Sequence, residues 1–167
     1  MYKAFIVDDD YGSVESIYNS INWNRLNITK VELIQNPTHI VERIISEKPE
    51  VVFIDIEMGD VSGLEIIKQL QEKKCGSIFV IVSGHDDFAY AKQAIEYGVI
   101  YYLLKPISNS EADNVTEKIF DALCVEQTEG MCSTDDICLY LADKLREAFP
   151  DVSVAMSAWH MDCAKFF

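Results

Sequence analysis

The sequence has few of the residues, and none of the long apolar runs, that mark several classes of protein. Its 167 residues include only seven glycines and four prolines, which excludes collagen-like chains and chains dominated by linkers. The longest apolar runs, such as residues 99–104, fall far short of the ~18–20 residues that a transmembrane helix needs. The N-terminus has no apolar stretch long enough for a signal peptide before its first acids. We therefore expect a soluble cytoplasmic protein with no membrane partner.

Basic residues and closely spaced cysteines are also scarce. The 14 Lys and Arg residues face 28 Asp and Glu residues, which gives a net charge of −14. This charge opposes electrostatic capture of nucleic acid or of an anionic membrane, and it suits a metal cation or a partner with a basic face. The five cysteines show no C-x-x-C spacing and their number is odd. We expect free thiols in a reducing compartment, because a zinc site needs closely paired ligands.

A regular alternation of two hydrophobic patterns fills the first three quarters of the chain. The length suits one domain with one core, and the apolar fraction of 49% is that of a globular protein. Nearly continuous apolar runs, typical of buried strands, occupy residues 3–7, 31–34, 51–54, 78–82 and 99–104. Apolar residues at helical spacing follow each run, within residues 14–21, 40–45, 64–70, 88–95 and 115–122. No tight hairpin turn joins these runs, so the pattern predicts a doubly wound α/β fold whose parallel sheet is covered by helices on both faces.

Residues 127–167 show a different pattern. Residues 126–130 are polar, residues 137–145 carry an apolar stripe at helical spacing, and a further short helix is expected after Pro150. Within residues 130–167 there are six acids and three bases, a balance that argues against specific DNA binding. We expect a short helical appendage that packs on the rest of the chain or on a second copy, giving a homodimer.

Reactive side chains stand at the carboxyl ends of the predicted strands. The first strand is followed by Asp8 and Asp9, the third by Asp55, the fourth by Ser83 and the fifth by Lys105. Ligands of open α/β sheets bind at this edge. Three neighbouring carboxylates repel one another unless a cation or a proton is present, and carboxylate oxygens suit Mg²⁺. One carboxylate could then attack a phosphoryl group, with the ammonium and hydroxyl neutralising charge.

Four motifs at these strand ends carry a family resemblance. Over residues 1 to about 126 the sequence resembles the receiver domain of two-component response regulators. The motifs are Val7-Asp8-Asp9, then Phe53-Ile54-Asp55-Ile56-Glu57-Met58 with Gly63-Leu64, then Ile81-Val82-Ser83-Gly84, and Tyr102-Leu103-Leu104-Lys105-Pro106. Each motif is weak alone, but their order along the chain is specific. The resemblance implies a flavodoxin-like sheet of five strands in the order 2-1-3-4-5.

The resemblance also implies an acceptor and a metal site. Asp55 would accept a phosphoryl group from a sensor histidine kinase in a Mg²⁺-dependent reaction. Asp8, Asp9 and Asp55 would bind the Mg²⁺ ion together with the main-chain carbonyl of Glu57. The chain would then be a signalling switch with self-catalysed phosphotransfer and slow autodephosphorylation, and not an enzyme that turns over a substrate. Asp10 is better explained as a helix-start acid than as a further ligand.

Three further residues complete the set that the resemblance implies. Ser83 and Lys105 would contact the phosphoryl group, and Tyr102 matches the aromatic residue whose ring position reports phosphorylation. The sequence departs from the usual family pattern at Gly59, where proline is common, and at Ser62, where aspartate is common. Glycine in place of proline adds backbone freedom, so the loop after Asp55 is expected to be less ordered.

Several outputs remain open at this point. The stretches Ile21-Asn22-Trp23 and 83–91 resemble response regulators with an AraC-type DNA-binding module, which predicts control of transcription, but only about 40 residues follow the receiver. Residues 127–167 are therefore either a truncated output module or a segment with another role. The alternative is a stand-alone receiver that acts as a phosphorelay intermediate or a protein-binding switch. His85 either tunes attack by water on an acyl phosphate or is a solvated loop residue. A phosphohydrolase is disfavoured, because that class places its nucleophile in an Asp-x-Asp motif after the first strand.

Overall fold

The central feature of the fold is a parallel sheet of five strands. The structure is a computed structural model that describes residues 2–127, with side chains to residue 124. The sheet contains β1 (Tyr2–Val7), β2 (Ile28–Ile34), β3 (Val51–Asp55), β6 (Ile78–Ser83) and β7 (Tyr101–Leu104), in the order β2-β1-β3-β6-β7. This is the predicted order 2-1-3-4-5, so the predicted doubly wound, flavodoxin-like architecture is confirmed. The helices expected within residues 128–167 lie outside the described residues.

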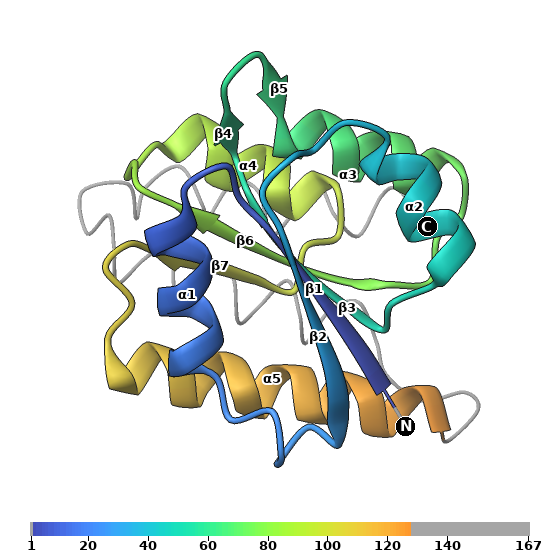
Figure 1. Ribbon diagram of the computed structural model, residues 1–167, viewed down its shortest axis with the longest axis vertical. Helices are drawn as coiled ribbons and strands as arrows, with labels where there is room; N and C mark the ends of the chain where they lie inside the picture. Colours follow the sequence, from blue (N-terminus) through green and yellow to red (C-terminus); the bar gives the residue numbers. More distant parts are fainter. Residues whose placement is uncertain (1, 128–167) are drawn as a thin grey trace, which may run out of the picture. The chain divides into compact units, whose positions relative to one another are not determined.

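Five helices cover the two faces of the sheet (Figure 1). On one face lie α1 (Tyr11–Ser20) and α5 (Asn109–Gln127), and on the other lie α2 (Ile40–Glu47), α3 (Gly63–Glu72) and α4 (Phe88–Glu96). Every residue of β3 and β6 is buried, which explains why these strands appear in the sequence as unbroken apolar runs. Phe5, Phe53 and Phe79 are among the largest fully buried side chains of the core. Within the described residues, no helix is long and apolar enough to cross a membrane.

The ends of two helices support the sequence analysis. Asp10 is the N-cap of α1, and its carboxylate accepts a hydrogen bond of 2.8 Å from the main-chain N–H of Ser13. Capping of this helix also lowers the pKa of Asp10. Asp87 caps α4 in the same way, through the N–H of Ala89. Asp10 is thus a helix-start acid, as predicted.

A small hairpin between β3 and α3 is not predicted by the sequence. Its strands are β4 (Glu57–Met58) and β5 (Val61–Ser62), which pair antiparallel and project beyond the sheet (Figure 1). The turn contains Gly59, whose φ is +61°. Proline is restricted to φ near −65° and cannot take this conformation. The structure thus gives a reason for the glycine, because a positive φ at the first turn residue suits a two-residue hairpin.

Candidate functional site

Three carboxylates gather at the carboxyl edge of the sheet. Because β1 and β3 are neighbours, Asp8 and Asp9 at the end of β1 lie beside Asp55 at the end of β3. Each of the three offers a carboxylate oxygen, and these atoms lie within 4.8 Å of one another. Asp8 and Asp55 are buried whereas Asp9 is exposed, so the cluster has one side open to solvent. The structure therefore brings together the three side chains that the sequence analysis singled out.

Lys105 reaches this cluster from the end of β7, the outermost strand of the sheet. It follows β7, and its main-chain N–H bonds to the carbonyl of Ser83 at the end of β6. Its Nζ atom lies 2.7 Å from Oδ2 of Asp8 and 3.1 Å from Oδ1 of Asp55. Asp8 also accepts a hydrogen bond of 2.9 Å from the main-chain N–H of Asp10. A fixed cation thus contacts two of the three acids.

The cluster is short of positive charge. Burial raises the pKa of Asp55, and the neighbouring charge of Asp8 raises it further, although Lys105 opposes both effects. Burial lowers the pKa of Lys105, but its hydrogen bond to Asp8 and the charge of Asp55 outweigh burial, so this pKa is raised. Three ionised carboxylates and one ammonium leave a net charge of −2. A divalent cation would balance this charge, and carboxylate oxygens are the ligands that Mg²⁺ prefers, so the donor set fits that ion.

The side chain of Glu57 contacts α4 and the loop before it. It lies in β4, and its exposed carboxylate accepts a hydrogen bond of 3.0 Å from the hydroxyl of Tyr90 in α4. Its other oxygen lies 3.3 Å from Nε2 of His85. A role for Glu57 in a metal site would therefore use its main chain, as the resemblance implies, and not its carboxylate. The sequence analysis did not predict the contacts of Glu57 with Tyr90 and His85.

Ser83 and Tyr102 both bond to the main chain of His85, in the loop that leaves β6. The Ser83 hydroxyl donates to the carbonyl of His85 and accepts from its N–H, at 3.1 Å in each case. The Tyr102 hydroxyl donates to the same carbonyl at 3.1 Å. Burial raises the pKa of Tyr102. Both residues lie at the predicted edge, where their hydroxyls hold the loop that connects β6 to α4.

Gly63 brings α3 close to the end of β3. Its N–H donates to the carbonyl of Ile56 at 2.8 Å. A Cβ atom at this position would lie 2.0 Å from the main-chain oxygen of Asp55, much closer than atoms can approach. Only glycine allows the chain to pass here without moving Asp55. The motif in the sequence contains this glycine, but its reason is visible only in the structure.

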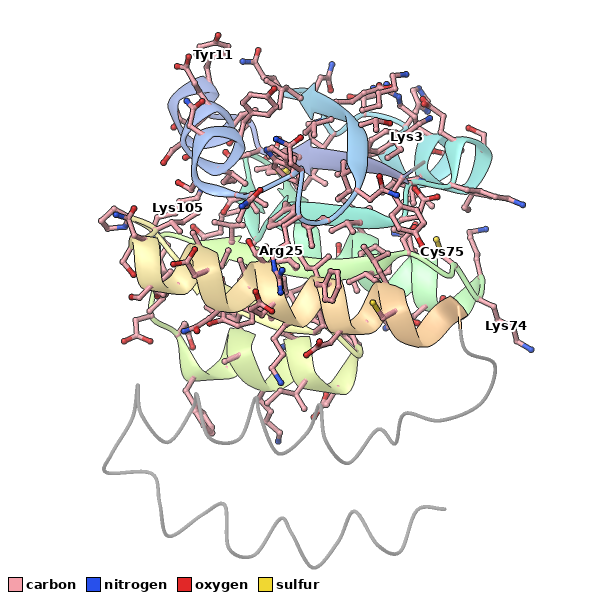
Figure 2. All side chains as sticks on the ribbon, turned by 90° about the horizontal axis from the view of Figure 1, so that it is seen from below. Lys3, Tyr11, Arg25, Lys74, Cys75 and Lys105 are labelled. Carbon is pink, nitrogen blue, oxygen red and sulfur yellow. The ribbon has the colours of Figure 1, made fainter. Side chains whose placement is uncertain are left out.

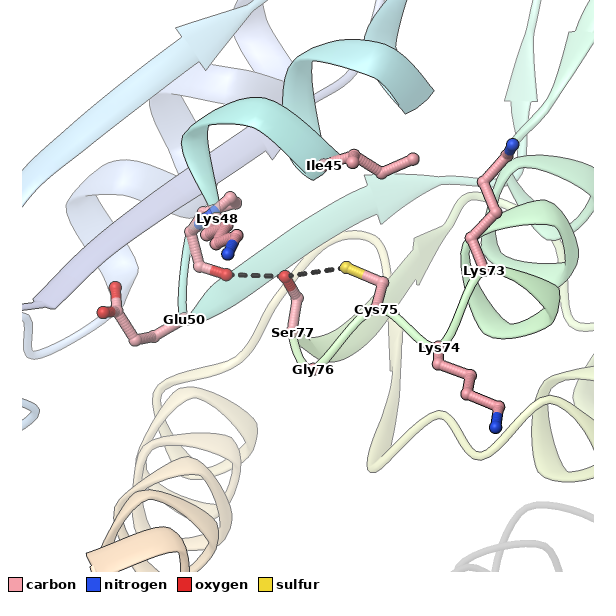
Figure 3. Close-up of a pocket in the computed structure, with 9 residues that line it drawn as sticks. Ile45, Lys48, Glu50, Lys73, Lys74, Cys75, Gly76 and Ser77 are labelled. Atoms are coloured by element: carbon pink, nitrogen blue, oxygen red, sulfur yellow. Dashed lines mark hydrogen bonds between the residues drawn. The ribbon is translucent and has the colours of Figure 1, made fainter.

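A separate pocket lies at the other end of the parallel strands, just before β3 and β6 begin. Figure 2 shows Lys105 and Tyr11 at one end of the molecule and Lys74 and Cys75 at the other. The pocket lies beside α2 and α3 and its volume is about 380 Å³ (Figure 3). Its polar lining includes Lys48, Lys73 and Lys74. Lys48 and Lys73 are the C-caps of α2 and α3, where cations offset the negative end of the helix dipole, so the basic lining has a structural explanation.

The fold and this constellation of side chains define a signalling receiver, and comparison with known proteins agrees. The chain belongs to the response regulator receiver domain family, whose profile matches residues 4–117. It is 32% identical over 123 residues to the uncharacterized transcriptional regulatory protein YesN of Bacillus subtilis, which covers 74% of this chain and 33% of YesN. It is 26% identical over 130 residues to the transcriptional regulatory protein HptR of Staphylococcus aureus, covering 78% of this chain and 51% of HptR.

Solved structures give the same result. The REC domain of AraT, a response regulator from Geobacillus stearothermophilus, superposes with a TM-score of 0.67 and 31% identity, covering 75% of this chain and 98% of that one. A two-component transcriptional regulator AraC from Clostridium phytofermentans gives a TM-score of 0.63 and 25% identity, over 74% of this chain and 96% of that one. The predicted receiver family is thus confirmed. The chain spans from one third to about half of the length of the curated relatives that it matches.

Proposed function

We propose that Asp55 accepts a phosphoryl group from a phosphohistidine of a sensor histidine kinase. A carboxylate oxygen of Asp55 attacks phosphorus, a new O–P bond forms, and the N–P bond breaks with its electron pair remaining on the histidine nitrogen. The single observation that carries this proposal is the cluster of three carboxylates and Lys105 at the carboxyl edge of the sheet. Lys105 contacts two carboxylates, those of Asp8 and Asp55. We choose Asp55 as the acceptor because it lies at the end of the central strand β3 and within the motif whose resemblance implies an acceptor.

The other residues of the site take separate roles in this proposal. Asp8, Asp9, Asp55 and the main-chain carbonyl of Glu57 would hold a Mg²⁺ ion, which neutralises charge on the phosphoryl oxygens when it is bound. Lys105 pairs with a phosphoryl oxygen, which takes the place of its present contact with Asp55.

Ser83 and Tyr102 form the switch. The Ser83 hydroxyl turns from His85 toward the new phosphoryl oxygens, and Tyr102 follows because both residues bond to the same main-chain carbonyl. The phosphoryl group thereby shifts a pre-existing equilibrium of the loop between β6 and α4.

We infer that this switch controls an output, most simply transcription. The relatives YesN and HptR are named as transcriptional regulatory proteins, and both are much longer than this chain. In this account the chain acts in the cytoplasm as a signalling switch, and its Asp55 phosphate is hydrolysed slowly. We do not expect specific DNA binding by this chain unless it is a piece of a longer protein. A homodimer formed through residues 127–167 also stays a prediction.

Labelling with a small phosphodonor tests the acceptor chemistry. In the presence of Mg²⁺, we expect one acyl phosphate per chain, which hydroxylamine removes. EDTA and Asp9→Ala should each abolish labelling, because the carboxylates then lack the balancing cation. Asp60→Ala is the matched control, since Asp60 is an exposed residue of the hairpin turn outside the carboxylate cluster. Labelling that is indifferent to both EDTA and Asp9→Ala would contradict the proposed site.

A further inference from the structure

A set of side-chain contacts joins the loop after Asp55 to α4. The Tyr90 hydroxyl donates to Oε1 of Glu57 at 3.0 Å, and Nε2 of His85 lies 3.3 Å from Oε2 of the same residue. We call these three residues the Glu57 bridge. Tyr90 belongs to α4 and His85 to the loop before it, whereas Glu57 lies only two residues after Asp55. The Glu57 bridge thus links two segments that are far apart in the sequence.

The hairpin that carries Glu57 has little structure of its own. Its two strands contain two residues each, and a two-stranded hairpin of any length is marginal in water. Met58 is buried and Gly63 bonds to Ile56, so the base of the hairpin is anchored. Glu57 itself is exposed, and its carboxylate is fixed by residues outside the hairpin. The Glu57 bridge is therefore a further support for the Glu57 backbone, beside the buried residues on either side of it.

Tyr90 is well placed to fix this orientation. Its ring packs against the hydrophobic core, which limits the positions that its hydroxyl can take. Its hydroxyl is the donor in the bond to Glu57, because a carboxylate can only accept. The side chain of His85 is more exposed, although its main chain bonds to Ser83 and Tyr102. Tyr90 is thus the member of the Glu57 bridge with the more rigid support.

We propose that Tyr90 is a positioning residue for the cation site. Through the Glu57 carboxylate, it holds the main chain of Glu57 in the orientation that the divalent cation requires, and it couples α4 to that cation. The inference rests on the proposed function, because only there does Glu57 contribute its carbonyl to the metal. Coupling between two sites is reciprocal, so the cation also stabilises the position of α4.

Cation affinity in the absence of any phosphodonor tests this proposal. Mg²⁺ binding is measured by calorimetry on the full chain, with Mn²⁺ binding by electron paramagnetic resonance as a check. Tyr90→Phe keeps the ring and removes the hydroxyl. We expect the apparent dissociation constant to rise about two- to five-fold, less than the full worth of a hydrogen bond to a charged group, because the bond is exposed and acts on the cation only through Glu57. Tyr97→Phe is the matched control, because Tyr97 also packs against the core from the end of α4. An unchanged affinity in Tyr90→Phe overturns the proposal.

A double-mutant cycle separates positioning from packing. Glu57→Ala removes the carboxylate and keeps the main-chain carbonyl. If Tyr90 acts through Glu57, Tyr90→Phe has no further effect on cation affinity in the Glu57→Ala background. If Tyr90→Phe weakens binding by the same factor in both backgrounds, the hydroxyl acts by another route and the proposal is overturned.

Hydrogen exchange gives a second readout on α4. Addition of Mg²⁺ should slow amide exchange within α4 of the wild-type chain and should slow it less in Tyr90→Phe. Equal slowing in both chains overturns the coupling. Labelling of Asp55 is measured separately. If the wild-type chain labels normally but Tyr90→Phe leaves the cation affinity unchanged, this inference alone is refuted. A wild-type chain that fails to label, with an affinity that responds to Tyr90→Phe, refutes the proposed function and supports the role of Tyr90 in cation binding.

Discussion

The ammonium of Lys105 lies 3.1 Å from the carboxylate of Asp55, across the width of β6. Asp55 is the last residue of β3 and Lys105 follows β7, so their contact depends on the parallel arrangement of β3, β6 and β7. The same ammonium also bonds to the buried carboxylate of Asp8. Lys105 therefore holds together two acids that would otherwise repel each other.

Replacing Lys105 with methionine should damage both folding and phosphorylation. The change leaves the buried Asp8 without its cation, and losing a hydrogen bond to a charged group costs about 1.5–3 kcal/mol of unfolding free energy. We expect phosphorylation of Asp55 by a small donor to slow by at least about ten-fold, equivalent to about 1.4 kcal/mol in the barrier. Urea unfolding and labelling rates measure the two effects. Lys92→Met, at an exposed pair with Glu96, should change neither; a Lys105 variant that matches it would contradict the assigned role.

Stabilisation by Mg²⁺ should depend on pH through Asp55. The folded state raises the pKa of Asp55, so it holds that proton more tightly than the unfolded chain does. Without metal, folding stability therefore falls as pH rises from the ordinary pKa of about 3.8 through the raised value. In the proposed site Mg²⁺ binds the ionised form, so we expect the increase in Tm that it causes to be larger at pH 7 than at pH 4.5. Asp55→Asn should show a smaller pH dependence of Tm without metal. An equal Mg²⁺ effect at both pH values would be evidence against ionisation of the cluster as the basis of binding.

Glu47, which lies far from the site, should make folding stability sensitive to acid. Hydrogen bonds from Arg43 and then Lys3 lower the pKa of Glu47 from 4.5 to about 2. This contribution to stability is complete above the ordinary pKa and is lost as pH falls from about 4.5 toward about 2. Because the pairs are partly exposed, each is worth at most about 1 kcal/mol. In urea unfolding, Glu47→Gln should be less stable than the wild type at pH 6 and closer to it at pH 2.5, whereas Glu96→Gln should show little difference at either pH. A Glu47→Gln deficit that stays constant with pH would argue against these ion pairs.

Gly63→Ala should disturb Asp55 directly. The added methyl group would lie 2.0 Å from the main-chain oxygen of Asp55, so the start of α3 or the end of β3 must move. We expect a loss of about 1–3 kcal/mol in unfolding free energy together with slower labelling of Asp55. Gly76→Ala is the matched control, because a Cβ atom there meets nothing within 4 Å. If Gly63→Ala labels and unfolds like the wild type, as Gly76→Ala is expected to do, the close approach at Gly63 matters neither for stability nor for labelling of Asp55.

The acid cluster and Lys105 could be predicted from sequence because parallel strands bring their carboxyl ends to one edge. Each strand run ends at its reactive residue, so the order of runs was enough to place Asp8, Asp55 and Lys105 together. Strand boundaries were less accurate. The second strand begins at Ile28 and not at residue 31, because β2 is an edge strand and its first polar residues are solvent-exposed.

The features that the sequence could not supply depend on side-chain contacts between distant segments. The strands β4 and β5 contain two residues each, too few to show any periodicity. The bond between Tyr90 and Glu57 joins residues that are 33 positions apart, and neither belongs to a motif that implies the contact. The sequence did not decide whether His85 tunes attack by water or is a solvated loop residue. The structure shows its main chain holding Ser83 and Tyr102, and no spacing rule could have predicted that.

Direct mapping of the phosphorylated residue tests the central claim most sharply. The wild-type chain is labelled with a small phosphodonor and Mg²⁺, reduced with borohydride to convert the acyl phosphate into a stable product, and sequenced by tandem mass spectrometry. The account predicts modification at Asp55, and none in an Asp55→Asn chain that remains folded. Modification at Asp8 or Asp9 of the wild-type chain, or undiminished labelling of Asp55→Asn, would contradict it.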